Sequence, residues 1–163
     1  MNIATNEYSE ARRLLLKGAG VAALVGLGVI PFDVPRALAA ANDKYPEDAF
    51  KQKTVADAIK ALYGKTAEPS DKVKMDAPEI AENGAVVPIS ATTTLSGVTS
   101  ISFLVSENPI SLVASYKIPD GTLPSVGNRI KMAKTSNVVV LVEADGKLYS
   151  ATKEIKVTVG GCG

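Results

Sequence analysis

Residues 101–118 read ISFLVSENPISLVASYKI, and this stretch decides the fold class. Apolar and small polar side chains alternate on both sides of Glu107-Asn108-Pro109, which is typical of a turn. A period of two places the apolar side chains on one face of an extended strand. The stretch therefore predicts two β-strands, each with one buried face. The predicted buried positions are Ile101, Phe103 and Val105 in the first strand, and Ile110, Leu112, Ala114, Tyr116 and Ile118 in the second.

Similar patterns continue towards the C-terminus. From Ile155 on, every second residue of Lys153–Val159 is apolar, which predicts a strand with one buried face. Residues 138–142 are apolar throughout, so we expect a central strand that is covered on both faces. Turn signals at Pro119-Asp120-Gly121 and Asp145-Gly146 separate these runs.

Three weaker strands are predicted at Lys72–Met75, Ala85–Ala91 and Arg129–Lys134. Pro88 has no backbone N–H to donate, so the second of these is predicted to be an edge strand or to contain a bulge. About seven short strands with regular turns predict a mainly β fold, an immunoglobulin-like antiparallel β-sandwich. The chain lacks the cysteine pair and the tryptophan of antibody domains.

A short helical segment is predicted ahead of the strands, within Pro46–Tyr63. Thr54, with Asp57 three residues later, resembles a helix start, and Gly64 is well placed as a stop. The apolar positions that recur at steps of three and four residues are Val55, Ala58, Ile59 and Leu62. This spacing gives one apolar helix face, which we expect to pack on the core.

Residues 1–39 are predicted to be an export signal rather than part of the fold. Arg12-Arg13 precedes an apolar stretch from Gly18 to Ile30, and Ala37-Leu38-Ala39 matches a small-x-small cleavage site. The twin arginines point to the Tat route and hence to a periplasmic protein. A membrane anchor is the alternative, but the apolar stretch is shorter than the roughly 20 residues that a spanning helix needs.

The charge and composition of the remaining chain exclude several classes of function. Residues 1–39 hold 4 of the 18 basic and 3 of the 17 acidic side chains, which leaves 14 of each in residues 40–163. A neutral domain lacks the basic surface that nucleic acids or anionic lipids require. With no histidine and one cysteine, the chain cannot assemble a metal site from soft ligands, so no cofactor is expected.

The single cysteine, Cys162, stands in Gly160-Gly161-Cys162-Gly163 directly after the last predicted strand. Glycine offers backbone freedom and no bulk, so residues 160–163 are predicted to be a flexible, slender arm after the domain of residues 40–159. From the end of that strand to Cys162, the chain spans at most about 10 Å. The thiol has no histidine to activate it. It is therefore better suited to carrying a group than to catalysis, and we expect a carrier protein rather than an enzyme.

Three other interpretations of Cys162 stay open. The terminal cysteine could join two copies of an exported structural or binding module through a disulfide, since a single thiol in a secreted chain suggests intermolecular pairing. The tail could be disordered with an incidental thiol. A thiol oxidoreductase is the third, although such enzymes usually have a second cysteine or a histidine.

The signal, the helix ahead of an all-β domain and the ending Gly-Gly-Cys-Gly together resemble the SoxY family, sulfur-carrier subunits of the periplasmic Sox system for thiosulfate oxidation. The family's tail is Gly-Gly-Cys-Gly-Gly, and its last glycine has no counterpart after Gly163. The resemblance implies that Cys162 is the covalent attachment point for sulfur intermediates. It also implies that Gly160, Gly161 and Gly163 form the carrier arm.

The resemblance further implies a set of partners. SoxY-like proteins form a heterodimer with a second β-sandwich subunit, SoxZ. A SoxAX-type c-type cytochrome joins thiosulfate to the cysteine, and a SoxB-type dimanganese hydrolase releases sulfate. In some bacteria a sulfane dehydrogenase oxidises the sulfur that remains. No nucleic acid is expected as a partner, and no membrane after signal cleavage.

Overall fold

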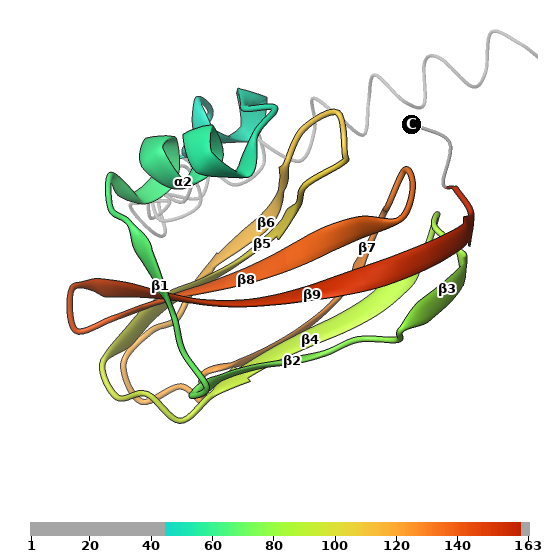
Figure 1. Cartoon of the computed structure of the whole chain (residues 1–163). Coiled ribbons are helices and arrows are strands. Elements are labelled where there is room, and N and C mark those ends of the chain that lie inside the picture. Colours follow the sequence, from blue (N-terminus) through green and yellow to red (C-terminus); the bar gives the residue numbers. More distant parts are fainter. Residues whose placement is uncertain (1–44, 161–163) are drawn as a thin grey trace, which may run out of the picture. The chain divides into compact units, whose positions relative to one another are not determined.

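A computed structural model describes residues 45–160, which form two β-sheets and a short helical cover (Figure 1). The predicted signal at 1–39 and residues 161–163 of the arm lie outside the described residues. The helical elements are the 3-10 helix η3 (Ala49–Lys51) and the α-helix α2 (Val55–Tyr63). The strands are β1 (Ala67–Pro69), β2 (Val73–Asp76), β3 (Ile80–Asn83), β4 (Val87–Thr93), β5 (Val98–Val105), β6 (Leu112–Lys117), β7 (Ser125–Ile130), β8 (Ser136–Ala144) and β9 (Lys147–Val159).

The larger sheet has the order β1-β9-β8-β5-β6, with β3 also paired to β9, and the smaller sheet has the order β2-β4-β7. The mainly β, two-sheet fold predicted from the sequence is thus confirmed. Most neighbouring strands are antiparallel, but β1 and β3 both run parallel to β9. These two strands have three and four residues, too few to show a period of two, and they raise the expected seven strands to nine in the described part of the chain.

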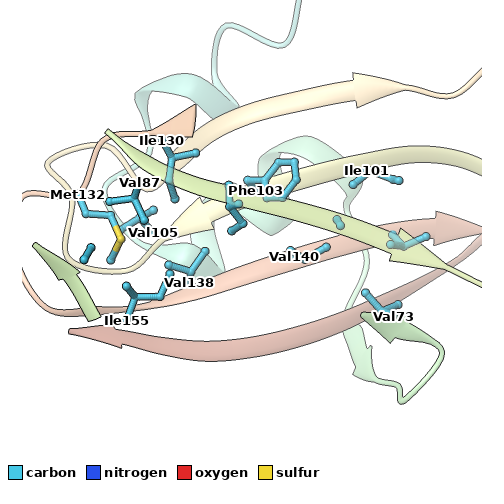
Figure 2. Close-up of a cluster of buried hydrophobic side chains, with 14 of the residues drawn as sticks. Val73, Val87, Ile101, Phe103, Val105, Ile130, Met132, Val138, Val140 and Ile155 are labelled. Carbon is cyan, nitrogen blue, oxygen red and sulfur yellow. The ribbon is translucent and has the colours of Figure 1, made fainter. Parts of the chain in front are cut away.

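The space between the two sheets holds the main hydrophobic core (Figure 2). Ile101, Phe103 and Val105 of β5 are fully buried in it, as predicted. The Phe103 ring meets the Tyr116 ring edge to face, with 6.3 Å between centroids. The other buried core residues are Val73, Ala81, Val87, Ile89, Ala91, Ile130, Met132, Val138, Val140, Val142, Ala144 and Ile155.

Strand β8 is covered on both faces, as its uninterrupted apolar sequence predicts. Val138, Val140 and Val142 face the main core. Val139 and Leu141 face a second cluster that the helical segment covers. The remaining buried members of that cluster are Ala49, Ala58, Leu104, Leu112 and Leu148. The helical segment therefore covers the outer face of the larger sheet.

Helix α2 begins and ends where the sequence predicts. The Thr54 hydroxyl accepts a hydrogen bond from the backbone N–H of Asp57 at 3.1 Å, which satisfies one of the free donors of the first turn. Gly64 follows the last helical residue in the left-handed conformation, with φ of 61°. Its N–H donates to the Lys60 carbonyl at 2.9 Å and closes the helix.

A β-bulge overturns the predicted face of the first residues of β6. Phe103 pairs with Ala114, but Leu104 pairs with Leu112, so one extra residue lies in β6 at this point. The extra residue reverses the alternation. Leu112 therefore faces the helix cluster, and Ile110, predicted to be buried, is 46% exposed.

Two further strand predictions are corrected by the sheet topology. Strand β4 is the middle strand of the smaller sheet and not an edge strand. Strand β2 ends at Asp76, opposite Ser90, so Pro88 lies beyond the end of β2 and has only β7 alongside. The strand predicted at Arg129–Lys134 ends at Ile130, and the residues after it form a loop.

A cluster of hydroxyl groups joins the end of α2 to the larger sheet. The Tyr63 hydroxyl lies 2.7 Å from the Ser102 hydroxyl and 3.0 Å from the Ser100 hydroxyl. Ser102 in turn donates to Ser115 at 2.8 Å. Burial raises the pKa of the Tyr63 phenol, and the hydrogen bonds to the serines act in the opposite direction. Ser102 is fully buried, so these partners provide hydrogen bonds that water cannot.

The substitution Tyr63→Phe removes the hydroxyl without changing the ring. We expect it to lower the free energy of unfolding by about 1–3 kcal/mol, because buried serine hydroxyls lose a partner. Urea denaturation followed by circular dichroism measures the difference. Tyr45→Phe is the matched control, because Tyr45 is 58% exposed, and it is expected to unfold like the wild type. Equal stability of Tyr63→Phe and wild type would contradict the prediction.

The advantage of the wild type over Tyr63→Phe should also depend on pH. Burial raises the pKa of Tyr63 in the folded state, so above about pH 10 the unfolded chain loses a proton that the folded chain retains. The extra stability is therefore complete below about pH 10 and decreases as the pH rises towards the higher folded pKa. Denaturation of both proteins at about pH 8 and about pH 11 tests this. A constant difference would contradict it.

Candidate functional site

The predicted carrier arm starts at the end of β9, and the structure describes this starting point as far as Gly160. Gly161, Cys162 and Gly163 lie outside the described residues, so their roles stay predictions. What the structure shows is how the chain is held just before the cysteine. We call the described part, Lys156–Gly160 with the backbone that contacts it, the arm root.

The last residues of β9 extend beyond β8 and are held by β3 instead. The β8 pairing ends at Ile155, opposite Ser136. Along the other edge, Asn83 of β3 lies opposite Val159, and the Gly84 N–H donates to the Val159 carbonyl at 2.8 Å. The arm root therefore remains hydrogen-bonded to the last residue of the strand.

Side chains complete the pairing of the arm root. The Val157 N–H donates to the Thr135 hydroxyl at 2.9 Å, which replaces the missing β8 neighbour. The Thr158 hydroxyl donates to the Glu82 carbonyl at 2.9 Å. The sequence predicts a buried Val159, but its side chain is 64% exposed because the strand here has passed the end of the core.

Gly160 is needed for a close approach between two backbone segments. A Cβ built on Gly160 would lie 2.3 Å from the Ala133 carbonyl oxygen, far inside van der Waals contact. Any other residue would force one of the two segments to move. The first glycine of the predicted arm thus has a packing role at the arm root in addition to the slimness expected from sequence.

The loop that faces Gly160 is itself fixed. The Asn108 amide donates to the Lys131 carbonyl at 2.7 Å and accepts from the Ala133 N–H at 2.9 Å. The N–H of the fully buried Met132 donates to the Gly84 carbonyl at 2.7 Å. The sequence predicts a turn at Asn108 but does not connect this residue with the arm, because nothing local shows that the two meet.

The groups with shifted pKa values lie at the opposite end of β9. The pKa of Glu143 is lowered, chiefly by the hydrogen bond from the Lys65 ammonium at 2.5 Å, and burial opposes this effect. Glu143 pairs with Leu148, near the start of β9, and Tyr63 contacts β5 near the same end. In residues 45–160 no three or more His, Cys, Asp or Glu side chains gather in a way that could hold a metal ion. The groups with shifted pKa values and the arm root therefore lie at opposite ends of β9.

An open depression of about 550 Å³ lies on the smaller sheet, beside Pro88 and Arg129. Its other lining residues are Asp76, Ala77, Pro78, Ile89, Ser90, Gly127 and Asn128. None of them belongs to the arm root, so the depression is separate from the candidate site.

The sequence profile of the family described as "Sulfur oxidation protein SoxY" matches residues 59–162, from α2 to the cysteine itself. The chain belongs to the SoxY family. The match covers more than half of the chain and confirms the resemblance that the helix, the β domain and the Gly-Gly-Cys-Gly ending suggest.

A solved structure of the sulfur carrier protein SoxY from Chlorobium limicola f thiosulfatophilum is similar to this SoxY family member. It has 44% sequence identity and a TM-score of 0.59, and the alignment covers 65% of this chain and 97% of that one. A superoxide reductase (neelaredoxin) from Ignicoccus hospitalis has 18% identity and a TM-score of 0.48, over 64% of this chain and 92% of that one. The low similarity to the superoxide reductase supports no inference about function. The comparison with curated proteins found no match.

The substitution Gly160→Ala tests the contact with Ala133. We expect the added methyl group to push the arm root away from the loop and to weaken the hydrogen bond between Gly84 and Val159, because the Cβ would overlap a backbone oxygen. Hydrogen exchange of the Gly84 amide, followed by NMR, should therefore become at least several-fold faster.

Gly127→Ala is the matched control, because a Cβ at Gly127 meets nothing within 4 Å. Its Gly84 amide should exchange at the wild-type rate. Unchanged exchange in Gly160→Ala as well would show that the close approach does not hold the arm root.

Proposed function

We propose that this SoxY family protein is a periplasmic covalent sulfur carrier in thiosulfate oxidation, and that Cys162 holds the pathway intermediates. The observation that carries the proposal is the arm root. Strand β9 is held by neighbours until Val159 and packed against Ala133 at Gly160, two residues before the only cysteine of the chain. A thiol so close to a fixed strand end is presented at a defined place while Gly161 and Gly163 keep its surroundings free of bulk.

The chemistry on Cys162 can be written in two balanced steps. In loading, the thiol and thiosulfate form an S–S bond, give a cysteine S-thiosulfonate, and release one proton and two electrons to a c-type cytochrome enzyme of the SoxAX type. In the second step, water attacks the terminal sulfone sulfur. The bond between the sulfone sulfur and the neighbouring sulfur breaks, sulfate and one proton are released, and a persulfide remains on Cys162. Both steps are carried out by partner enzymes, so the carrier needs no catalytic group of its own.

The residues of the chain are consistent with a carrier that is not an enzyme. The chain contains no histidine, and nucleophilic cysteines normally need a base or a positive field beside the thiol. A second cysteine is also missing, so no thiol in the same chain can attack the persulfide and discharge it. The group on Cys162 therefore persists until a partner enzyme acts on it.

The partners in this proposal are protein subunits. A SoxZ-like β-sandwich subunit forms the heterodimer, and a SoxAX-type cytochrome, a SoxB-type hydrolase and a sulfane dehydrogenase bind transiently. Export by the Tat route through the signal at residues 1–39 brings the carrier to the periplasm. Among residues 45–160, no helix has the length and apolar character that crossing a membrane requires.

A disulfide-linked dimer of an exported binding module is the alternative. This alternative also uses the single cysteine, but it predicts a stable homodimer that only a reductant separates into monomers. The distinction lies in what is bonded to Cys162 in cells that oxidise sulfur compounds: a sulfur-containing group or a second copy of the chain.

The substitution Cys162→Ser tests the carrier function. We expect thiosulfate-dependent electron transfer to the cytochrome to fall to background, because a hydroxyl cannot form the S–S bond. The variant should keep the wild-type melting temperature, since residue 162 follows the last strand. Intact-mass spectrometry of the wild-type protein, incubated with thiosulfate and the cytochrome enzyme, should show an added thiosulfonate that Cys162→Ser lacks. Full turnover by the variant would contradict the proposal, and a reductant-sensitive homodimer as the only wild-type product would favour the alternative.

A further inference from the structure

The end of β3 carries the only Asn-Gly pair in the sequence, Asn83-Gly84. Asn83 is the last residue of the strand, and Gly84 begins the turn that leads to β4. An asparagine before a glycine is prone to lose its side-chain amide, because no glycine side chain shields the backbone nitrogen that attacks it. We propose that Asn83 is a site of spontaneous deamidation, and that the hydrogen bond between Gly84 and Val159 controls the rate of this modification.

The reaction balances with water as its only co-reactant. The backbone nitrogen of Gly84 attacks Cγ of Asn83, and the bond between Cγ and Nδ2 breaks. The amide group leaves as ammonia, together with the proton that the Gly84 nitrogen gives up, and a five-membered succinimide ring remains. Water then opens the ring at one of its two carbonyl groups. The product is either an aspartate at position 83 or an isoaspartate, whose backbone contains one additional carbon atom.

The turn after β3 supplies a hydrogen-bond donor that this reaction needs. The Asn83 side chain is exposed, and its Oδ1 accepts a hydrogen bond from the Ala85 N–H at 2.8 Å. Negative charge develops on this oxygen when a nucleophile adds to Cγ. A backbone N–H that already points at the oxygen stabilises that charge. The local structure of the turn therefore favours attack on the Asn83 amide.

The arm root opposes the attack by holding Gly84 in place. The Gly84 N–H donates to the Val159 carbonyl at 2.8 Å, so the attacking nitrogen is already engaged. The Gly84 carbonyl accepts from the Met132 N–H at 2.7 Å, and Gly84 itself is buried. The nitrogen can turn towards Cγ only when these contacts open. The rate of deamidation should therefore follow the fraction of molecules in which the arm root is open.

Modification should in turn loosen the arm root. Asn83 lies opposite Val159 in the pairing of β3 with β9. The additional backbone carbon of an isoaspartate displaces the N–H and carbonyl of Gly84 from their partners, because hydrogen bonding between strands depends on register. An aspartate keeps the backbone and adds one negative charge. The isoaspartate product thus removes the last strand contact before the cysteine.

Incubation of the full chain in mildly alkaline buffer tests the proposal. Mass spectrometry of the tryptic peptide that follows Lys74 measures the conversion of Asn83. Asn108 is in the same peptide but cannot form a succinimide in this way, because Pro109 has no N–H. We expect deamidation of Asn83 to be at least about tenfold slower in the folded protein than in protein unfolded by guanidinium chloride, because closed molecules do not react.

Gly160→Ala and Gly127→Ala are the matched variants, because an added Cβ overlaps the Ala133 carbonyl only in the first. Asn83 should deamidate several-fold faster in folded Gly160→Ala than in the wild type, and at the wild-type rate in Gly127→Ala. Equal rates in folded and unfolded wild type would overturn the proposal. A wild-type rate in Gly160→Ala, with faster exchange of the Gly84 amide, would also overturn it. If Gly160→Ala does not fold, the comparison of folded with unfolded wild type decides.

Hydrogen exchange of the Met132 amide tests the consequence of the modification. In the isoaspartate fraction of aged protein it should be several-fold faster than in fresh protein, because its partner Gly84 is displaced. Asn83→Gln is the control, since its longer side chain does not form the five-membered ring, and its Met132 exchange should not change with age. Unchanged exchange in the isoaspartate fraction would overturn this part of the proposal. No partner enzyme takes part, so these outcomes do not depend on whether Cys162 carries sulfur.

Discussion

Strand β9 must satisfy its backbone hydrogen bonds on both edges over 13 residues, and the rest of the structure depends on this requirement. Strand β8 occupies one edge as far as Ile155. The other edge is shared by β1 near the start of β9 and by β3 near its end, and both are parallel to it. Beyond Ile155, the Thr135 side chain replaces β8. This arrangement carries an ordered strand past the end of the core and up to the residues that precede the cysteine.

The two ends of the sandwich have different tasks. At the start of β9, buried hydroxyls join Tyr63 to the larger sheet, and the Lys65–Glu143 ion pair ties the end of α2 to β8. The groups with shifted pKa values lie here and serve the fold. At the other end, hydrogen bonds from Gly84 and to Thr135 hold the backbone of the arm root in place. In the proposed function, this separation allows the body to be stable independently of the residues that follow Gly160.

In the proposed function, the protein contributes geometry to sulfur oxidation and its partners contribute the chemistry. The chain has no histidine that could activate the thiol, and in the proposed function a short arm admits only enzymes that approach the body. The same shortness explains why the body matters for recognition. Only Gly161 lies between Gly160 and Cys162, so in the proposed function a partner that reaches the thiol also approaches the folded domain.

The sequence by itself determined the features that depend on local patterns. Alternation of apolar residues located β5 and β9 and most of their buried faces, and an uninterrupted apolar run located β8. The Thr54 and Gly64 signals bounded α2, and the Gly-Gly-Cys-Gly ending pointed to the family and to Cys162. These inferences succeed because the period of side chains along a strand or helix, and the chemistry of a lone thiol, are properties of adjacent residues.

Only the tertiary structure decided the features that depend on residues far apart in the chain. Strands β1 and β3 exist because β9 has a free edge, not because three or four residues favour a strand. The bulge that turns Leu112 towards the helix follows from its pairing with Leu104. The contact of Gly160 with Ala133, supported by Asn108, joins three segments that no local pattern connects. Such contacts arise because backbone groups in distant segments must find hydrogen-bond partners in the folded protein. The sequence determines these contacts, but no local pattern in it reveals them.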